Sequence, residues 1–155
     1  MVSQPKWDIY ESALIIETYL FCKDLPHKDQ VPYLETLSKN LRLIAKNKGL
    51  KIDDTYRNLN GMNMQFQSIK YLFTGKGAFN NPSKMFVKAY KLYMKDRASF
   101  YLILSDAHLM IENKFDFAQL NSYSSDYNLF TQTEDFDLPD NEITELIISQ
   151  PHHLK

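Results

Sequence analysis

The sequence predicts an all-α protein. We expect a domain of about five helices over residues 6–118, with a trihelical, helix-turn-helix-like core, and then an acidic, aromatic-containing tail over residues 119–155. Apolar residues recur at spacings of three and four through the first part of the chain, which is the period of an amphipathic helix. Only four Gly and six Pro occur among 155 residues, which argues against an all-β chain with many tight turns.

Capping signals define the first two helices. Asp8 and Glu11 have the spacing of a capping box, so the first helix is expected to begin at Asp8. Pro26 disfavours helical geometry in the residue before it and ends this helix. The second helix is expected over residues 32–48, because Pro32 suits a first helical position, where no N–H is needed. The apolar face of the first helix is expected to comprise Tyr10, Ala13, Leu14, Ile15, Ile16, Leu20 and Phe21.

The third helix belongs to a central stretch over residues 56–70. Asn58 or Asn60 can cap it, because a short amide side chain accepts a hydrogen bond from a free N–H of the first turn. One apolar stripe follows at helical spacing, formed by Met62, Phe66, Ile69 and Phe73. The opposite face is polar and carries Asn63, Gln67 and Lys70.

The fourth helix, expected over residues 84–95 with Ser83 as its cap, carries a row of four lysines. Their spacing of i, i+4, i+7 and i+11 puts Lys84, Lys88, Lys91 and Lys95 on one face. Like charges at this spacing cost a few tenths of a kcal/mol per pair, and a solvated face usually mixes signs. The row is therefore expected to face an anionic ligand, with a solvated face as the alternative. Asp96 is expected to cap a fifth helix that extends to about Leu109.

Charge is distributed unevenly along the chain. The net charge is −1, but residues 1–100 hold 16 Lys and Arg against 9 Asp and Glu, whereas residues 101–155 hold 2 against 10. Such asymmetry indicates a surface that binds a polyanion and an acidic tail that is solvated or lies on the basic part. The alternative is that the two parts simply neutralise each other.

No residue pattern predicts catalysis, a metal site or a cofactor, so we expect no enzyme. Cys22 is the single cysteine and lies in an apolar run, which indicates a buried, inert thiol. The four histidines do not have zinc-ligand spacing, and no glycine-rich phosphate loop occurs. The chain also has no apolar run of about 20 residues and no apolar leader. We therefore expect a cytoplasmic protein that does not contact membranes.

The polar part of the central stretch predicts contact with duplex DNA. In trihelical DNA-binding units, the N-terminal end of the third helix enters the major groove. Asparagine and glutamine pair with adenine, and arginine pairs with guanine. The groove residues are expected to be Arg57, Asn58, Asn60, Asn63, Gln67 and Lys70, with Lys84, Lys88, Lys91 and Lys95 on phosphates. Arg57 and Asn58 have a structural alternative, in which they bridge helices and Gly61 permits close packing.

Three short elements of the sequence resemble a known module. Trp7 followed by Glu11, then Leu-Ser-x-x-Leu-Arg over residues 37–42, then Tyr-Arg-Asn-x-x-Gly over residues 56–61, are similar to the N-terminal domains of bacterial HNH-type restriction endonucleases and related phage-defence proteins. The resemblance covers about residues 7–107 and implies a DNA-recognition or accessory module without catalytic activity. No nuclease motif accompanies it in this sequence, so the implied partner is a separately encoded nuclease or other effector. The alternative is a protein-interaction subunit that holds the effector through its basic body or aromatic tail.

Overall fold

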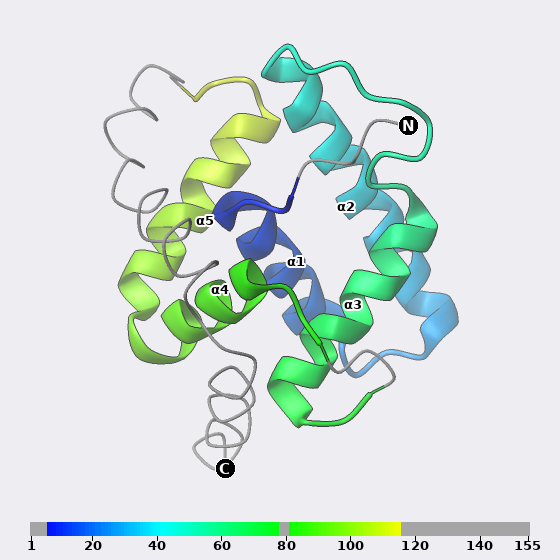
Figure 1. The fold of residues 1–155 in the computed structure, drawn as a ribbon, viewed down its shortest axis with the longest axis vertical. Coiled ribbons are helices and arrows are strands. Elements are labelled where there is room, and N and C mark those ends of the chain that lie inside the picture. Colours follow the sequence, from blue (N-terminus) through cyan, green and yellow to red (C-terminus); the bar gives the residue numbers. More distant parts are fainter. Residues whose placement is uncertain (1–5, 78–80, 116–155) are drawn as a thin grey trace.

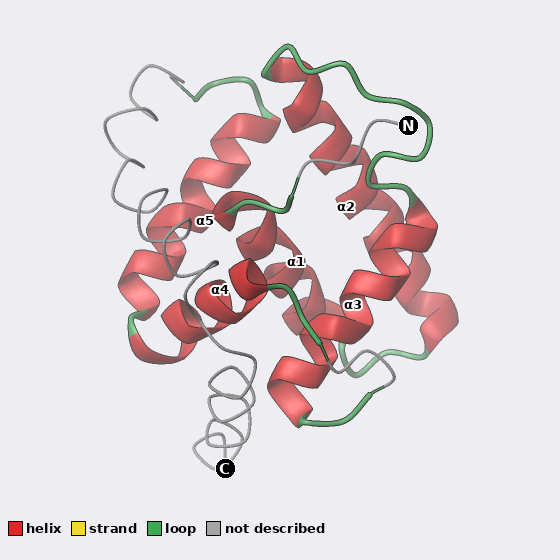
Figure 2. Ribbon diagram, viewed as in Figure 1, coloured by secondary structure: helices red, strands yellow, loops and turns green. Residues whose placement is uncertain are grey.

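The computed structural model describes residues 6–77 and 81–115, and within these ranges all regular secondary structure is helical (Figure 2). The five helices are α1 (Ile9–Cys22), α2 (His27–Asn47), α3 (Leu59–Thr74), α4 (Lys84–Lys95) and α5 (Arg97–Ile111). The expected all-α domain of five helices is therefore confirmed. The expected tail over residues 119–155 lies outside the described residues.

Helix α1 is the centre of the fold. It lies among the other four helices and contacts each of them (Figure 1). Every residue from Ile9 to Ile16 is buried, because apolar side chains occur all round this part of the helix. A helix that is apolar on all sides is stable only inside a core. The remaining helices therefore arrange their apolar faces around α1.

The predicted caps of α1 and α3 are present. Asp8 accepts a hydrogen bond from the Glu11 backbone N–H at 2.8 Å, and Glu11 accepts one from the Asp8 N–H at 3.1 Å. Of the two asparagines that could cap α3, Asn58 is the cap. Gly75 ends α3 in the left-handed region with φ of 72°, a conformation that glycine adopts without a steric penalty.

The prediction for the start of the second helix was wrong. Helix α2 begins at His27, and Pro32 lies inside it instead of at its first position. Its first turn is held by Gln30, whose buried side chain donates a 2.9 Å hydrogen bond to the carbonyl of Cys22 at the end of α1. A proline near a helix start removes one backbone hydrogen bond, and this tertiary anchor offsets that loss.

The helix directions place α2 and α3 side by side. The end of α2 lies near the start of α1, where Lys48 forms a 3.3 Å ion pair with Asp8, so α2 is antiparallel to α1. Phe73, near the end of α3, stacks on Tyr19 near the end of α1 with ring centroids 4.9 Å apart, so α3 follows α1 in direction. Helix α3 lies beside α2, on the other side of α1 from α5 (Figure 1).

The connection between α2 and α3 differs from a helix-turn-helix motif. It spans residues 48–58, whereas the turn of that motif has three or four residues. A connection of this length does not by itself fix the angle between two helices. The side chains that hold this connection also position the start of α3.

Phe21 differs from its predicted place on the apolar face, since 72% of its surface is exposed in the last turn of α1. Phe66 is buried in the core, so the two residues form a matched pair. Phe66→Ala should lower the free energy of unfolding by about 3–5 kcal/mol, because it leaves a cavity. Phe21→Ala should lower it by less than about 1 kcal/mol. Urea unfolding of both variants checks this, and equal losses would contradict the packing described.

Candidate functional site

Arg57 is a buried bridge between the α2–α3 connection and α1. Its Nε and one terminal nitrogen donate to the two carboxylate oxygens of Glu11, at 2.9 and 3.1 Å. The two side chains are only 5% and 7% exposed. The guanidinium also lies 4.6 Å from the ring centroids of both Trp7 and Tyr56. A guanidinium can stack on aromatic faces while it binds a carboxylate, so one side chain joins three segments.

Two α2 side chains fix the backbone of the same connection. The Ser38 hydroxyl donates to the carbonyl of Arg57, which has a left-handed φ of 48°. Arg42 donates to the carbonyls of Asp53 and Tyr56, at 3.0 and 2.6 Å. These are residues of the Leu-Ser-x-x-Leu-Arg element. In this chain that element holds the connection against α2.

Burial dominates the electrostatics of the bridge. Desolvation raises the pKa of the Glu11 carboxyl above its ordinary value, the nearby Asp8 carboxylate adds to this, and the hydrogen bonds from Arg57 oppose it. Desolvation lowers the pKa of Arg57, but its bonds with Glu11 outweigh this and leave the pKa raised. Each charge is therefore tolerable only because the other is present.

Asn58 and Gly61 shape the start of α3. The Asn58 side-chain oxygen accepts a 2.8 Å hydrogen bond from the Gly61 N–H. A Cβ atom on Gly61 would lie 3.3 Å from that oxygen, so a larger residue would crowd the cap. The structural alternative weighed for Arg57 and Asn58 fits these contacts. The placement of both in the groove set is corrected, because their polar groups are already engaged inside the protein.

The remaining predicted groove residues share one face of α3. At 3.6 residues per turn, Asn60, Asn63, Gln67 and Lys70 lie within a sector of about 80°, away from the buried stripe. Asn60 and Lys70 are exposed, and Asn63 and Gln67 are half-buried. Among the described residues, none of their side chains forms a hydrogen bond or an ion pair, and the Asn63 oxygen is buried without a partner. This row is called the α3 amide face below. It also contains Met64, which the sequence analysis did not single out.

Two exposed lysines of α2 lie close in sequence to the side chains that bind the α2–α3 connection. Lys39 follows Ser38, which bonds to Arg57, and Lys46 lies two turns further along the same side of α2. Both lysines are exposed and line a depression of about 460 Å³. It is lined by Glu35, Ser38, Lys39, Arg42, Leu43 and Lys46.

The lysine row of α4 does not join the α3 amide face. Tyr90 and Tyr93 contact Phe73 of α3, with ring centroids 4.8 and 5.9 Å apart. The lysines lie roughly half a turn round the helix from these tyrosines. Lys88 is only 4% exposed, Lys84 and Lys91 are half-buried, and Lys95 is exposed. The expected continuous exposed row is therefore corrected, because α4 is buried on both sides around Lys88.

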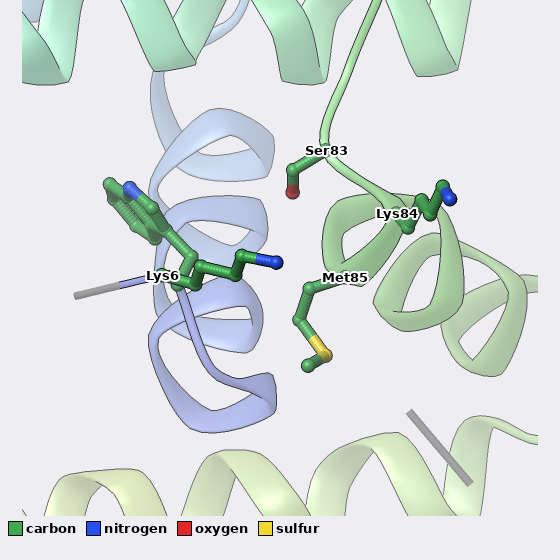
Figure 3. Close-up of a pocket in the computed structure, with 5 residues that line it drawn as sticks. Lys6, Ser83, Lys84 and Met85 are labelled. Carbon is green, nitrogen blue, oxygen red and sulfur yellow. The ribbon is translucent and has the colours of Figure 1, made fainter. Parts of the chain in front are cut away.

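A further depression of about 340 Å³ lies between Trp7 and the start of α4 (Figure 3). Lys6 and Met85 extend toward it, whereas Lys84 points away. The Ser83 hydroxyl caps α4 by accepting from the Phe86 N–H at 3.1 Å, and both lysines take part in further interactions. The Ser83 hydroxyl and both lysines that line this space are thus already engaged in interactions.

The residues considered for catalysis are dispersed. Cys22 is fully buried, and burial raises the pKa of its thiol. His108 on α5 pairs with Glu17 on α1 at 2.9 Å, at the protein surface. Over residues 6–77 and 81–115, no three His, Cys, Asp or Glu side chains gather as metal ligands would. None of the described helices combines the length and the apolar character that crossing a membrane requires.

In comparisons with known proteins, no family model, no curated protein and no solved structure matches this chain.

The Arg57–Glu11 bridge can be tested by a double-mutant cycle. Arg57→Met leaves a buried carboxylate, and Glu11→Gln leaves a buried guanidinium while keeping a side chain that suits the capping box. Each single change should cost about 3–5 kcal/mol of unfolding free energy. The double variant should cost less than the sum, by about 1–3 kcal/mol, because neither charge is left alone. Additive losses in urea unfolding would show that the two groups do not stabilise each other.

Proposed function

We propose that this chain binds duplex DNA through the α3 amide face, as an accessory recognition module without catalytic activity of its own. One observation carries the proposal: Asn60, Asn63 and Gln67 share one face, and their side chains make no hydrogen bonds within the described residues. By contrast, Asn58, Gln30 and Asn47 use their amides inside the protein, in bonds to backbone groups. The amides of Asn60 and Gln67 are available to an external partner, whereas Asn63 can offer only its NH2 group because its oxygen is buried.

The chemistry of that row fits base edges. An amide side chain can donate to the N7 atom of adenine and accept from its N6 amino group at once, and asparagine and glutamine bind adenine in this bidentate way. The major groove is about 12 Å wide and admits one helix. The neighbouring helix α2 would then present Lys39 and Lys46 to the phosphates that border the groove. Phosphate contacts of this kind position a protein on DNA, and base contacts supply specificity.

The buried bridge supports the proposal in a different way. A recognition helix reads bases only if its first turn is held in a fixed place and direction. The start of α3 is fixed by Arg57 on Glu11, by Ser38 on the Arg57 carbonyl, and by the Asn58 cap. These contacts hold the start of α3 in place and do not involve the side chains of the α3 amide face.

The proposed setting is a restriction or phage-defence system, with a separately encoded nuclease or other effector as the partner. Its support is the sequence resemblance over residues 7–107. Within this chain, the residues that carry the resemblance are those of the bridge, including Ser38, Arg57 and Asn58. These residues explain how the start of α3 is held in place, and none of them identifies a reaction.

A second candidate function is that of a protein-interaction subunit. It is favoured by exposed apolar residues at the end of α1 and on neighbouring helices, namely Phe21, Leu25, Tyr33, Tyr101 and Leu102. Phe21 and Tyr33 stack on each other with centroids 6.4 Å apart, outside the core. Salt separates the two candidates, because binding through phosphates weakens steeply with ionic strength and binding through an apolar interface does not.

The phosphate contacts can be tested with two matched pairs of lysines. Lys39→Gln with Lys46→Gln should weaken binding to all duplex sequences and lower the slope of log K against log salt by about 2, since each phosphate contact contributes about 0.9. Lys91→Gln with Lys95→Gln on α4 is the control and should leave the slope unchanged. Fluorescence anisotropy at several salt concentrations measures both. If only the α4 double variant lowers the slope, the phosphate contacts lie on α4 and not on α2.

The base contacts predict a change of preference without a loss of fold. Asn60→Ala and Gln67→Ala should each reduce discrimination at one base pair by about 1–3 kcal/mol, whereas the melting temperature stays near that of the parent. Selection from a random duplex pool, followed by sequencing, reads the preference of each variant. Gln65→Ala, which removes a half-buried amide of α3 outside the α3 amide face, serves as the control. Identical sequence preferences in all variants would show that these α3 side chains do not contact bases.

A further inference from the structure

Met64 is an apolar exception on the α3 amide face. Half of its surface is exposed, whereas Met62, two residues earlier, is buried in the core. It lies four residues after Asn60 and three before Gln67, so it is a neighbour of both on the helix surface. Exposing a long apolar side chain to water has a cost that burial against a partner removes. The position of Met64 among unused amides indicates where that partner would be.

The floor of the major groove offers one exposed apolar group, which is the C5-methyl of thymine. In an A·T pair it accompanies the adenine N6 donor and N7 acceptor, the groups that an asparagine or glutamine amide binds. A G·C pair presents no such methyl unless its cytosine is methylated at C5. One face with amides and an exposed thioether methyl therefore has the donors, acceptors and apolar contact that an A·T pair presents.

We propose that Met64 is a specificity-determining residue that contacts the C5-methyl group of thymine, so that the α3 amide face selects A·T pairs. This inference rests on the proposed function and names the part of DNA that it reads. Met64 has no charge, so its contribution to binding affinity depends on the base that it contacts and not on salt. Lys70 carries the positive charge of the same face. The same methyl chemistry occurs in 5-methylcytosine, and the experiment distinguishes the two sources.

The test compares duplex pools that differ by one methyl group. The full chain is titrated by fluorescence anisotropy against a random-sequence pool made with thymine and the same pool made with uracil, which lacks the C5-methyl. The thymine pool should bind about fourfold more tightly, the ratio expected for burying one methyl group. Met64→Ala should bind both pools equally, at the level of the parent on the uracil pool. Met64→Leu keeps an apolar side chain and should keep most of the difference.

A third pool, with uracil for thymine and 5-methylcytosine for cytosine, separates the sources of the methyl. If it binds no more tightly than the uracil pool, the methyl is read in A·T pairs, as proposed. If it restores the affinity of the thymine pool, the assignment to A·T pairs is overturned. Equal binding of thymine and uracil pools by the parent overturns the role of Met64 and leaves the proposed function standing. Failure to bind any pool at low salt overturns the proposed function itself.

Discussion

The buried ion pair between Arg57 and Glu11 is the constraint on which the rest of this structure depends. Removing a guanidinium and a carboxylate from water is costly, and the pair is tolerated because two direct hydrogen bonds and two aromatic rings surround it. It joins the first turn of α1 to residues that lie 46 positions later. Without it, the connection over residues 48–58 would have few other ties to α1, and the start of α3 would lose its fixed place.

Polar side chains in this protein divide into two groups. Ser38, Arg42 and Asn58 bind backbone groups of the connection and of the first turn of α3. Asn60 and Gln67, a few residues later, bind nothing within the described residues. The first group determines where α3 begins, and the second group is available for contact with a partner. Stability and recognition can therefore change independently, because no side chain of one group is a partner of the other.

The positive charge counted along the sequence overstates the charge that a ligand would meet. Arg57 is neutralised inside the protein, and Arg42 is directed to backbone carbonyls. Arg97 lies over the ring of Tyr93 at 3.8 Å, and Lys88 is buried. The exposed cations of α2 and α3 include Lys39, Lys46 and Lys70. A charge total is thus a poor guide to a surface until each side chain has been placed.

The sequence by itself determined the helical class, the five helices and their main caps, because helical periodicity and capping are local interactions between residues three or four apart. It also determined which amides share a face of α3. Only the tertiary structure decided that Arg57 faces inward, that α2 begins at His27, and that Lys88 of α4 is buried. Those outcomes depend on contacts between residues far apart in the chain, such as Arg57 with Glu11 and Gln30 with Cys22. Periodicity assigns a residue to a face of its own helix, but only packing decides what that face meets.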